Sequence, residues 1–539
     1  MKKKPIAEPL VVENTSPVEN PAAVNNTAPA SSKKAPVSKA AGAEPAAVDA
    51  APEKLAAPEK LAAPEKMAAP KQPSLEERVK QGKAARAAYP RGLLADWSPP
   101  ADRPDPVGLL EAQGATRLAE LLPIRYGRML ASPFAFYRGA AAIMASDLAS
   151  APHTGLQVQL CGDAHIANFG GFASPERELI LDINDFDETL PGPWEWDLKR
   201  LAASLEIAGR ERNFDARTRS KLVLACVSEY HSAMAEFAAL SNLDMWYLHL
   251  TPADIRARWG LNTKPRAMKA ITADFTLGRH HDNQRAFEKL TRRVNGKLGI
   301  VSNPPLVVPI EDLLGATAAA GMVNSFHGLL HTYRQSLQPD RRSLLESYSY
   351  VDMARKVVGV GSVGTRTWII LLAGRDENDP LFLQVKEAQA SVLEPYLGKS
   401  IYADHGKRVV EGQRMMQAAS DIFLGWDRVG GKEHRTHGLD DQPHDYYIRQ
   451  LWDWKISANI ENMQPSELLV YGKMCGWTLA RAHARSGDRV AVAAYLGKSA
   501  EADQALVEFA RAYADQNERD FQALEAAVTA GRIQAQKNI

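Results

Sequence analysis

Apolar and polar positions alternate along the chain with two different periods, which predict helices and strands in separate regions. Apolar side chains three and four residues apart indicate amphipathic helices at 74–89, 106–122, 215–241, 321–337, 406–420, 466–486 and 500–532. Short apolar runs bounded by turn residues indicate strands at 155–160 and 178–183, and an antiparallel meander at 356–364, 366–374 and 380–388. We therefore expect an α+β fold in which a mostly antiparallel, strand-rich region separates two mainly helical regions.

Residues 1–73 lack the apolar side chains from which a core is built. The first aromatic residue of the chain is Tyr89, and Ala, Pro, Lys, Glu, Asn and Ser dominate the segment before it. A hexapeptide, APEKLA, recurs over 51–68, the last time as APEKMA, so that proline interrupts any helix at every repeat. We predict a disordered Ala/Pro/Lys-rich tail at 1–73, followed by a first helix whose N-cap is Ser74.

Composition and charge exclude several classes of protein. Lys+Arg is 65 and Asp+Glu is 64, and this balance gives the whole chain no electrostatic attraction to nucleic acid or to a membrane surface. No apolar run approaches the ~20 residues that a membrane helix needs. Cys161, Cys226 and Cys475 lie far apart, which predicts neither a disulfide framework nor a cysteine zinc site. We expect a cytoplasmic protein that binds neither nucleic acid nor membrane.

The densest group of chemically active side chains lies between Leu160 and Thr189. A predicted strand leads into Asp163, four residues separate Asp163 from Asn168, and a second strand ends in an acidic stretch that contains Asp185. Phosphoryl transfer uses a carboxylate to orient the acceptor hydroxyl, and an Asn and an Asp to hold Mg²⁺ on the nucleotide phosphates. The Asp-x-x-x-x-Asn interval and the later Asp-Phe pair match a kinase catalytic loop and its metal carboxylate. We therefore predict Asp163 as the catalytic base and Asn168 and Asp185 as Mg²⁺ ligands.

Further side chains in this stretch have open roles. His165 is a candidate catalytic donor or ligand, although a histidine that braces the loop would give the same pattern. Asp182 and Asp187 flank the metal carboxylate, and one of them could be a second metal contact while the other is a hydrogen-bonded turn residue. Asp-rich turns often only cap strands and helices, so the acidic stretch alone does not indicate a function. The motifs around it provide that indication.

A glycine-rich segment about two hundred residues after the acidic stretch has the composition of a phosphate-binding loop. The sequence VVGVGSVGTR (357–366) contains Gly359, Gly361 and Gly364, with Ser362 among them. Glycines allow backbone N–H groups to approach phosphate oxygens because no Cβ intervenes. We predict that these residues bind nucleotide, with a tight turn that has no ligand as the alternative.

A lysine lies near the end of the apolar strand that follows the glycines. Lys386 is in PLFLQVKEA, and an ammonium in so apolar a strand is costly unless it has an anionic partner. A nucleotide phosphate and a helix carboxylate would serve, as they do in kinases. Glu411 on the next predicted helix is the first candidate for that carboxylate, ahead of Glu387 and Glu394.

These motifs resemble those of a known group of enzymes. Gly162-Asp163-x-His165-x-x-Asn168 is similar to the catalytic loop of aminoglycoside- and choline-kinase-like phosphotransferases, and Asp185-Phe186-Asp187 resembles their metal-binding step. The segment 193–204 resembles the Pro…Asp-Leu-x-Arg segment that follows, which implies that Asp197 is a buried carboxylate bracing the catalytic loop. The chain from about 75 to 539 also resembles a bacterial family known as domain of unknown function 2252, through GDAHIANFG, NDFDE, WDLKRLAAS, KVVGVGSVGTR and LQVKEA.

The resemblance implies a protein-kinase-like fold of two lobes, but the motifs occur in a different order. In ordinary kinases the glycine loop and the lysine precede the catalytic loop, whereas here they follow it. TLARAHA (478–484) resembles the helix that in these phosphotransferases leads directly into the catalytic loop, yet it lies near the C-terminus. We therefore predict a circular permutation, with a catalytic-loop lobe at 74–345, a nucleotide lobe at 346–450, and helices that complete the catalytic lobe at 451–539.

Together the motifs predict an enzyme that transfers phosphate from ATP, with Mg²⁺ as cofactor. Asp163 implies a hydroxyl acceptor, and the resemblance favours an unknown small molecule over a protein. The same residues could also carry out nucleotidyl transfer, which the sequence does not distinguish from phosphoryl transfer. Alternatively, Asp163-x-His165 with the downstream aspartates could form the two-metal site of a phosphoesterase. A catalytically silent nucleotide-binding protein is the third alternative.

Arginines and histidines outside these motifs complete the set of candidates. Arg128 and Arg138 lie among aromatic residues in 125–139, where they could grip a phosphate or the carboxylate of an acceptor, or pair with the aspartates. The histidines in 280–282 and 434–444 lack a regular element or a spacing that would make them metal ligands. We expect those histidines on the surface.

Overall fold

The computed structural model describes residues 73–269, 283–294, 296–430, 442–537 and 539. The predicted tail lies outside these ranges as far as residue 72, and so do residues 280–282, His434 and His437. Contacts divide the chain into Met1–Pro70 and Lys71–Ile539, and every element below belongs to the second unit. Within the described ranges, each helix is too short or too polar to span a bilayer.

Helix α1 (Leu75–Ala88) begins where the sequence predicts. The hydroxyl of Ser74, its N-cap, accepts a hydrogen bond from the N–H of Glu77, and the Glu77 carboxylate accepts one from the N–H of Ser74. This reciprocal pair satisfies donors that the start of a helix otherwise leaves open. The helix packs against α18 (Arg489–Leu496), where Arg78 and Asp488 form an ion pair.

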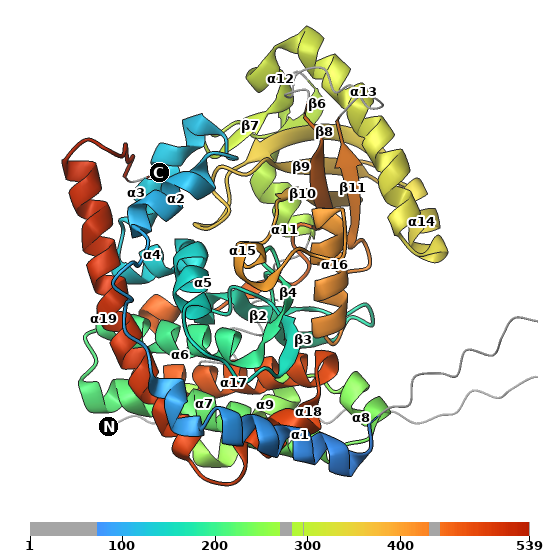
Figure 1. Cartoon of the computed structure of the whole chain (residues 1–539). Coiled ribbons are helices and arrows are strands. Elements are labelled where there is room, and N and C mark those ends of the chain that lie inside the picture. Colours follow the sequence, from blue (N-terminus) through green and yellow to red (C-terminus); the bar gives the residue numbers. More distant parts are fainter. Residues whose placement is uncertain (1–72, 270–282, 295, 431–441, 538) are drawn as a thin grey trace, which may run out of the picture. The chain divides into compact units, whose positions relative to one another are not determined.

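A six-stranded antiparallel sheet forms the strand-rich region of the described chain (Figure 1). Its order is β11-β12-β10-β9-β8-β7, with bounds Gly425–Val429, His444–Gln450, Pro380–Ala388, Thr367–Ala373, Ser349–Lys356 and Val307–Pro309. The predicted antiparallel meander is confirmed, but its first strand is β8 at 349–356 and not 356–364. Gly359 and Gly364 have φ values of +65° and +94°, which end the extended backbone and make 357–366 a connection.

Different elements cover the two faces of this sheet. Leu383 and Val385 pack in a core with α12 (Ile310–Leu314), α13 (Ala316–Tyr333) and α14 (Pro339–Glu346). Phe382 belongs to the core on the other face, with α11 (Asn283–Leu290) and the hairpin of β5 (Thr291–Val294) and β6 (Lys297–Ile300). Because side chains alternate along a strand, Lys386 lies on the face of Phe382 and not on that of Val385.

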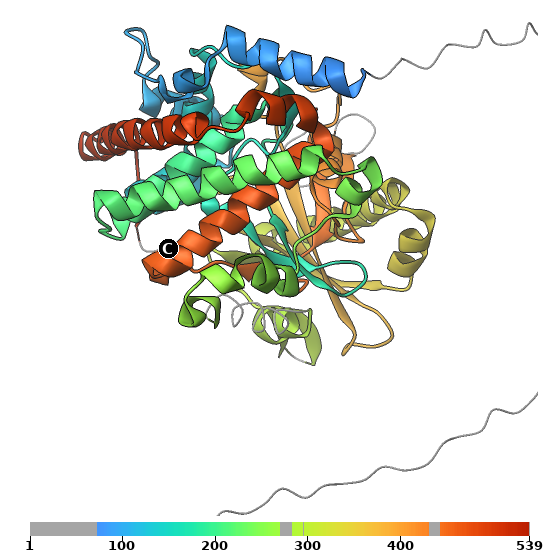
Figure 2. The ribbon, with the colours of Figure 1, turned by 90° about the horizontal axis from the view of Figure 1, so that it is seen from below.

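Long helices from both parts of the chain form the second lobe. α6 (Trp194–Glu211) and α7 (Ala216–Ala238) follow residues 160–189, the predicted catalytic segment, which keeps this name below. α17 (Pro465–Ser486) and α19 (Glu501–Thr529) lie near the C-terminus. Seen from below, α7 lies between α17 and α19 (Figure 2). Gly476 lets α17 come close, because a Cβ there would overlap the carbonyl oxygen of Cys226 on α7. Segments far apart in sequence therefore build one core.

Small sheets carry the catalytic segment on this helical lobe. β1 (Gln157–Leu160) pairs with β4 (Leu190–Pro193), and β2 (Phe169–Ala173) lies between β3 (Leu179–Ile183) and β13 (Ile456–Ser457). The predicted strands at 155–160 and 178–183 are confirmed as β1 and β3. Further helices of the described chain are α2 (Pro106–Gly114), α3 (Leu122–Met129), α4 (Pro133–Gly139), α5 (Ala141–Ala149), α8 (Asn242–Tyr247), α9 (Pro252–Trp259), α15 (Glu394–Leu397) and α16 (His405–Met416).

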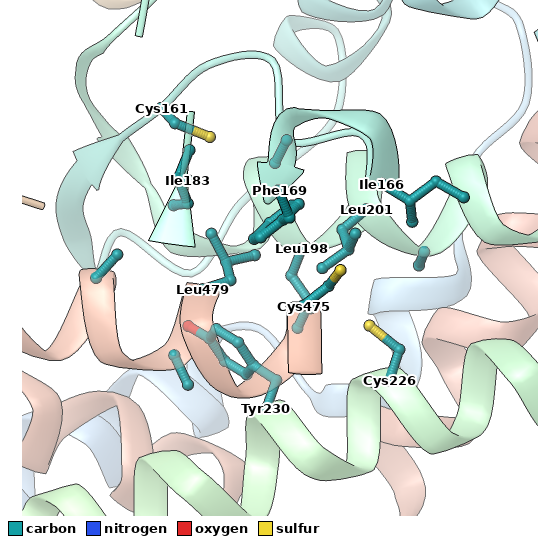
Figure 3. Close-up of a cluster of buried hydrophobic side chains, with 14 of the residues drawn as sticks. Cys161, Ile166, Phe169, Ile183, Leu198, Leu201, Cys226, Tyr230, Cys475 and Leu479 are labelled. Carbon is teal, nitrogen blue, oxygen red and sulfur yellow. The ribbon is translucent and has the colours of Figure 1, made fainter. Parts of the chain in front are cut away.

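Apolar side chains from several of these elements meet beneath the catalytic segment (Figure 3). Phe169 of β2 and Ile183 of β3 pack in one core with Leu198 and Leu201 of α6 and with Leu479 of α17. Each of these side chains is 1% exposed or less. Close-packed cores deform little, so the loops that leave β1 and β3 rest on a rigid base.

We expect Gly476→Ala to destabilise the protein by about 1–3 kcal/mol, because the added methyl group overpacks the contact between α7 and α17. Gly472→Ala, one turn earlier on α17, is the matched control, since its Cβ would meet Leu205 at an ordinary 3.5 Å. That control should be neutral or stabilising by up to about 1 kcal/mol, the gain in helix propensity. Chemical denaturation measures the difference, and equal stability of the two variants would contradict the close approach.

Candidate functional site

A cavity of about 730 Å³ brings together the two segments that the sequence predicts to converge. In Figure 1 the strands β8–β10 lie above the hairpin of β2 and β3, and both regions contribute to its lining. The catalytic segment provides Asp163, His165, Asn168, Asn184, Asp185, Asp187 and Glu188, and the sheet region provides Gly359, Val360, Gly361, Ser362, Thr365 and Glu387. Gln113 of α2 and Arg138 of α4 form a further wall.

The catalytic loop begins at a position that only glycine fits. Gly162 has a φ of +82°, and a Cβ there would overlap the carbonyl oxygen of Glu188. The loop after β1 is therefore pressed against the acidic stretch after β3. This contact places Asp163 beside Asp185 and Asp187 in the cavity wall.

Asp163 is held by an arginine of α6. Nε of Arg200 donates to Oδ1 of Asp163 at 2.6 Å, and the guanidinium lies over the ring of Tyr137, 4.4 Å from its centroid. Burial raises the pKa of Asp163, and Arg200 opposes that rise. Nε2 of His165 lies 3.8 Å from Oδ2 of Asp163, too far for a hydrogen bond. Burial holds the pKa of His165 well below its usual value, so its imidazole is neutral.

Asp197, at the start of α6, braces the catalytic loop as the resemblance implies. Its carboxylate accepts hydrogen bonds from the backbone N–H groups of Cys161 at 2.8 Å and Gly162 at 3.0 Å. Nε2 of His483 on α17 lies 3.3 Å from the same carboxylate. The helix that carries TLARAHA therefore supports the loop from below, although it follows it by three hundred residues, about the length of two domains.

The side-chain amide of Asn168 is oriented by its own loop. Its side-chain Nδ2 donates to the backbone carbonyl oxygen of Asp163 at 2.8 Å. The backbone carbonyl oxygen of Asn168 accepts a hydrogen bond from the backbone N–H of Asn184 at 2.8 Å. Because the amide nitrogen is used, the Oδ1 atom is the one left to face the cavity. The loop and the acidic stretch are thereby joined at the position where a metal ligand is predicted.

Lys386 reaches the acidic stretch from the sheet. Its Nζ lies 2.8 Å from Oδ2 of Asp187, which also accepts from Oγ of Ser362 at 3.2 Å. The other oxygen of Asp187 accepts from the hydroxyl of Tyr447 on β12 at 2.6 Å. Burial acts to raise the pKa of Asp187, but Lys386 and Tyr447 outweigh it, and the pKa is lowered. One carboxylate thus connects β10, β12 and the glycine segment.

Asp185 and Asn168 fit a Mg²⁺ ion by their chemistry. Burial and the neighbouring Asp187 raise the pKa of Asp185, although Lys386 and Arg449 act in the opposite direction. No group of three or more His, Cys, Asp and Glu side chains in the described ranges forms a complete metal site. Mg²⁺ is commonly bound by one or two carboxylates, with phosphates and water supplying the other oxygens, so this incomplete set suits it.

Arginines hold the glycine segment from behind. Nη1 of Arg128 donates to the carbonyl of Gly359 at 2.6 Å, and Nη1 of Arg117 donates to the carbonyl of Gly361 at 2.7 Å. Arg128, which the sequence suggests as an acceptor ligand, is thus committed to the loop. The backbone of the segment is fixed beside the cavity by the lobe that carries the catalytic loop.

The prediction that Glu411 is the carboxylate partner of Lys386 is wrong, because Lys386 pairs with Asp187. Glu411 lies 3.4 Å from Arg414 on the exposed side of α16, and α16 instead directs Arg408 to the carbonyl oxygens of Asp187 and Thr189, each at 2.8 Å. The rotation of a helix about its axis decides which side chain faces a neighbour, and the motif does not contain that information.

The weaker candidates for the same role have other partners. Glu387 pairs with Arg366 and with His444, whose Nδ1 lies 3.1 Å from Oε1 of Glu387. His444 is the first residue of β12, so the prediction that it is a surface loop residue is wrong. Glu394 lies 3.8 Å from His405. Glu387 lines the cavity, but its carboxylate is taken up by Arg366 and His444 and not by Lys386.

Asp182 is a structural residue and not a metal ligand. Arg481 of α17 donates to its Oδ1, as does the N–H of Ile183 at 2.8 Å, and the N–H of Ala418 donates to Oδ2 at 3.0 Å. The side chain is 1% exposed and lies in the middle of β3, turned away from the cavity. Its acceptors are occupied by the protein, so the metal role proposed for it is wrong.

Two candidates of the site lie outside the sequence motifs. Arg449 and Lys455 carry positive charge near Asp185, and burial lowers the pKa of Lys455 to about 8. Arg449 follows Tyr447 by two positions on β12, where the register places Tyr447 opposite Lys386. A charged side chain in an apolar strand was the signal that identified Lys386, and the same signal in HDYYIRQ would have identified Arg449.

We expect Arg481→Met to reduce the free energy of unfolding by about 3–5 kcal/mol, because it leaves the carboxylate of Asp182 buried without its counter-charge. Adding Asp182→Asn to that variant should recover part of the loss, so that the two substitutions are strongly non-additive. Thermal and chemical denaturation of both single variants and the double variant measure this coupling. Additive effects would contradict the structural role of Asp182.

Comparison with known proteins places the chain in a family. The family model described as "Uncharacterized protein conserved in bacteria (DUF2252)" matches residues 117–527. No curated protein and no solved structure matches the chain. The matched residues include the catalytic loop, the acidic stretch, the glycine segment, Lys386 and α17. The chain belongs to this bacterial family.

Proposed function

We propose that this protein is a Mg²⁺- and ATP-dependent phosphotransferase that acts on a hydroxyl group of a small molecule. The observation that carries the proposal is the cavity in which the catalytic loop, the acidic stretch and the glycine segment meet. A phosphoryl-transfer site needs an acceptor carboxylate, metal ligands, a phosphate-binding backbone and a cation within reach of one triphosphate. The carboxylates, the amide and the glycine segment line the cavity, and Lys386 reaches its wall through Asp187.

The side chains at the cavity support separate tasks in this reaction. Asp163, whose carboxylate is 18% exposed, would orient the acceptor hydroxyl and take its proton, and Arg200 favours the ionised form that this requires. Asp185 and Asn168 would hold Mg²⁺, which supplies neutralisation of charge on the phosphates. Lys386 would contact the phosphates from the sheet while Asp187 keeps its ammonium in place.

A permuted protein-kinase-like fold is part of the proposal, and the end of α17 supports it. The N–H of Gln159 on β1 donates to Oγ of Ser486 at 3.2 Å, and a Cβ on Gly487 would lie 2.8 Å from the carbonyl oxygen of Gln157. In the phosphotransferases the helix that α17 resembles leads directly into the catalytic loop. Here α17 ends beside β1, the strand that precedes that loop. A direct connection between these neighbours would give the ordinary motif order, with α18, α19 and the helices before β1 as additions to it.

The metal assignment predicts that Asp185→Asn removes the Mg²⁺-dependent part of the thermal stabilisation by ATP. Wild-type protein should be stabilised by ATP with Mg²⁺ more than by ATP with a chelator. Asp376→Asn, a charge-matched change in the exposed turn between β9 and β10, should behave as wild type. An unchanged Mg²⁺ effect in Asp185→Asn would contradict the assignment.

The role of Asp163 predicts that Asp163→Asn keeps the stabilisation by Mg²⁺ and ATP but lowers ATP consumption by about 10²-fold or more, the usual effect of losing a general base. The assay uses pooled hydroxylated metabolites as acceptors. Equal consumption in the variant would remove Asp163 from the mechanism. Release of phosphate from simple phosphate esters without nucleotide would instead favour the phosphoesterase alternative.

A further inference from the structure

Arg138 stands out among the buried arginines that line the cavity because no ion pair or hydrogen bond joins its guanidinium to a described residue. It lies on α4 and lines the cavity, and its Nε is buried without a hydrogen-bond partner in the described residues. Its neighbours are all committed, since Arg117 and Arg128 bind carbonyl oxygens of the glycine segment and Arg200 binds Asp163. Burial lowers the pKa of Arg138, yet a guanidinium stays charged in a protein.

Arg138 lies at the end of the cavity where the acceptor would react. Its charge acts on Asp163 and on His165, whereas Lys386 and Arg449 act on Asp185. The backbone of Arg138 lies against the glycine segment, because a Cβ on Gly361 would come within 3.3 Å of its carbonyl oxygen. The guanidinium is therefore within electrostatic reach of the carboxylate that would orient the acceptor.

A second unpartnered group faces the same end of the cavity. Nδ1 of His165 is buried and has no hydrogen-bond partner in the described residues, and the side chain is 4% exposed. Buried polar atoms are nearly always paired, so a ligand that completes them is the simplest explanation for two such groups on one wall. A charged guanidinium without a counter-ion is the costlier of the two, and an oxyanion satisfies it best.

We propose that Arg138 binds a carboxylate or phosphate group of the acceptor, and that the acceptor is therefore an anionic hydroxyl compound. This inference rests on the proposed function and names its substrate class. The planar guanidinium would hold the oxyanion with paired hydrogen bonds, and Asp163 would meet a hydroxyl elsewhere on the same molecule. His165 would contribute its free nitrogen to the same polar surface.

The first test is the binding of inorganic phosphate to the full chain, measured as thermal stabilisation at constant ionic strength. Saturating Mg²⁺ and ADP are present to occupy the nucleotide site, and the measurement is repeated without them. Wild type and Arg256→Gln, a surface change of equal charge on α9, should be stabilised. Arg138→Gln should lose most of the phosphate effect, and Arg138→Lys should retain part of it.

The outcomes of this test separate the two proposals. Equal stabilisation of Arg138→Gln and wild type by phosphate would overturn the role of Arg138. Loss of the Mg²⁺ and ADP effect in Arg138→Gln would also overturn it, because the guanidinium would then belong to the nucleotide site. A wild-type protein that responds to phosphate through Arg138 but not to Mg²⁺ and nucleotide would refute the proposed phosphotransferase and leave the anion site standing.

The second test compares acceptors that differ only in charge. ATP consumption is measured with glycerol, glycerol 3-phosphate and glycerate, so that the phosphate and carboxylate forms are distinguished. At least one anionic compound should be consumed faster than glycerol, and Arg138→Gln should raise its KM by about tenfold or more with a smaller change in kcat. Equal rates for the neutral and both anionic compounds, or an unchanged KM in the variant, would overturn the inference.

Discussion

The ion pair between Lys386 and Asp187 is the contact on which the arrangement of the cavity depends. Lys386 is 3% exposed, and an ammonium withdrawn from water must keep a carboxylate beside it. Tyr447 and Ser362 donate to the same carboxylate, one from β12 and one from the glycine segment. Removing any of these groups would leave the others partly unsatisfied, so they constrain one another. Through Asp187 the sheet is held over the lobe that carries the catalytic loop.

The polar loops of the site can be irregular because buried side chains satisfy their backbone atoms. Asp197 accepts the N–H groups of Cys161 and Gly162, and Arg408 donates to the carbonyl oxygens of Asp187 and Thr189. A loop buried without such partners would lose more free energy than its packing returns. These braces come from helices whose apolar faces are anchored in the core of Figure 3. The side chains that line the cavity are thus positioned before any ligand arrives.

Site residues that lie close together in the sequence were predictable from it. The direction in which a side chain points from its strand or helix was not. Asp163, Asn168 and Asp185 could be found because their spacing within one loop and hairpin fixes their proximity. Lys386 could be found because a charge in an apolar strand requires a partner. Asp182 and Glu411 were misassigned because the direction of a strand or helix side chain depends on packing against segments hundreds of residues away, such as Arg481 of α17. The sequence left two roles open for Arg138 for the same reason, because its role depends on which neighbouring charged groups are already paired.

The distribution of charge in the cavity distinguishes its two ends. Lys386 and Arg449 face Asp185 and Asp187 at one end, where cations and carboxylates offset one another. Beside Asp163, Arg200 already forms an ion pair with that carboxylate, and Arg138 has no hydrogen-bonded counter-ion among the described residues. An anion entering there gains the most electrostatic free energy, close to the carboxylate that would orient its hydroxyl. A neutral acceptor would leave the guanidinium desolvated and unpaired, which is the costlier state. The unsatisfied charge therefore favours an acceptor with its own negative group, and it does so without competing for the phosphates of the nucleotide.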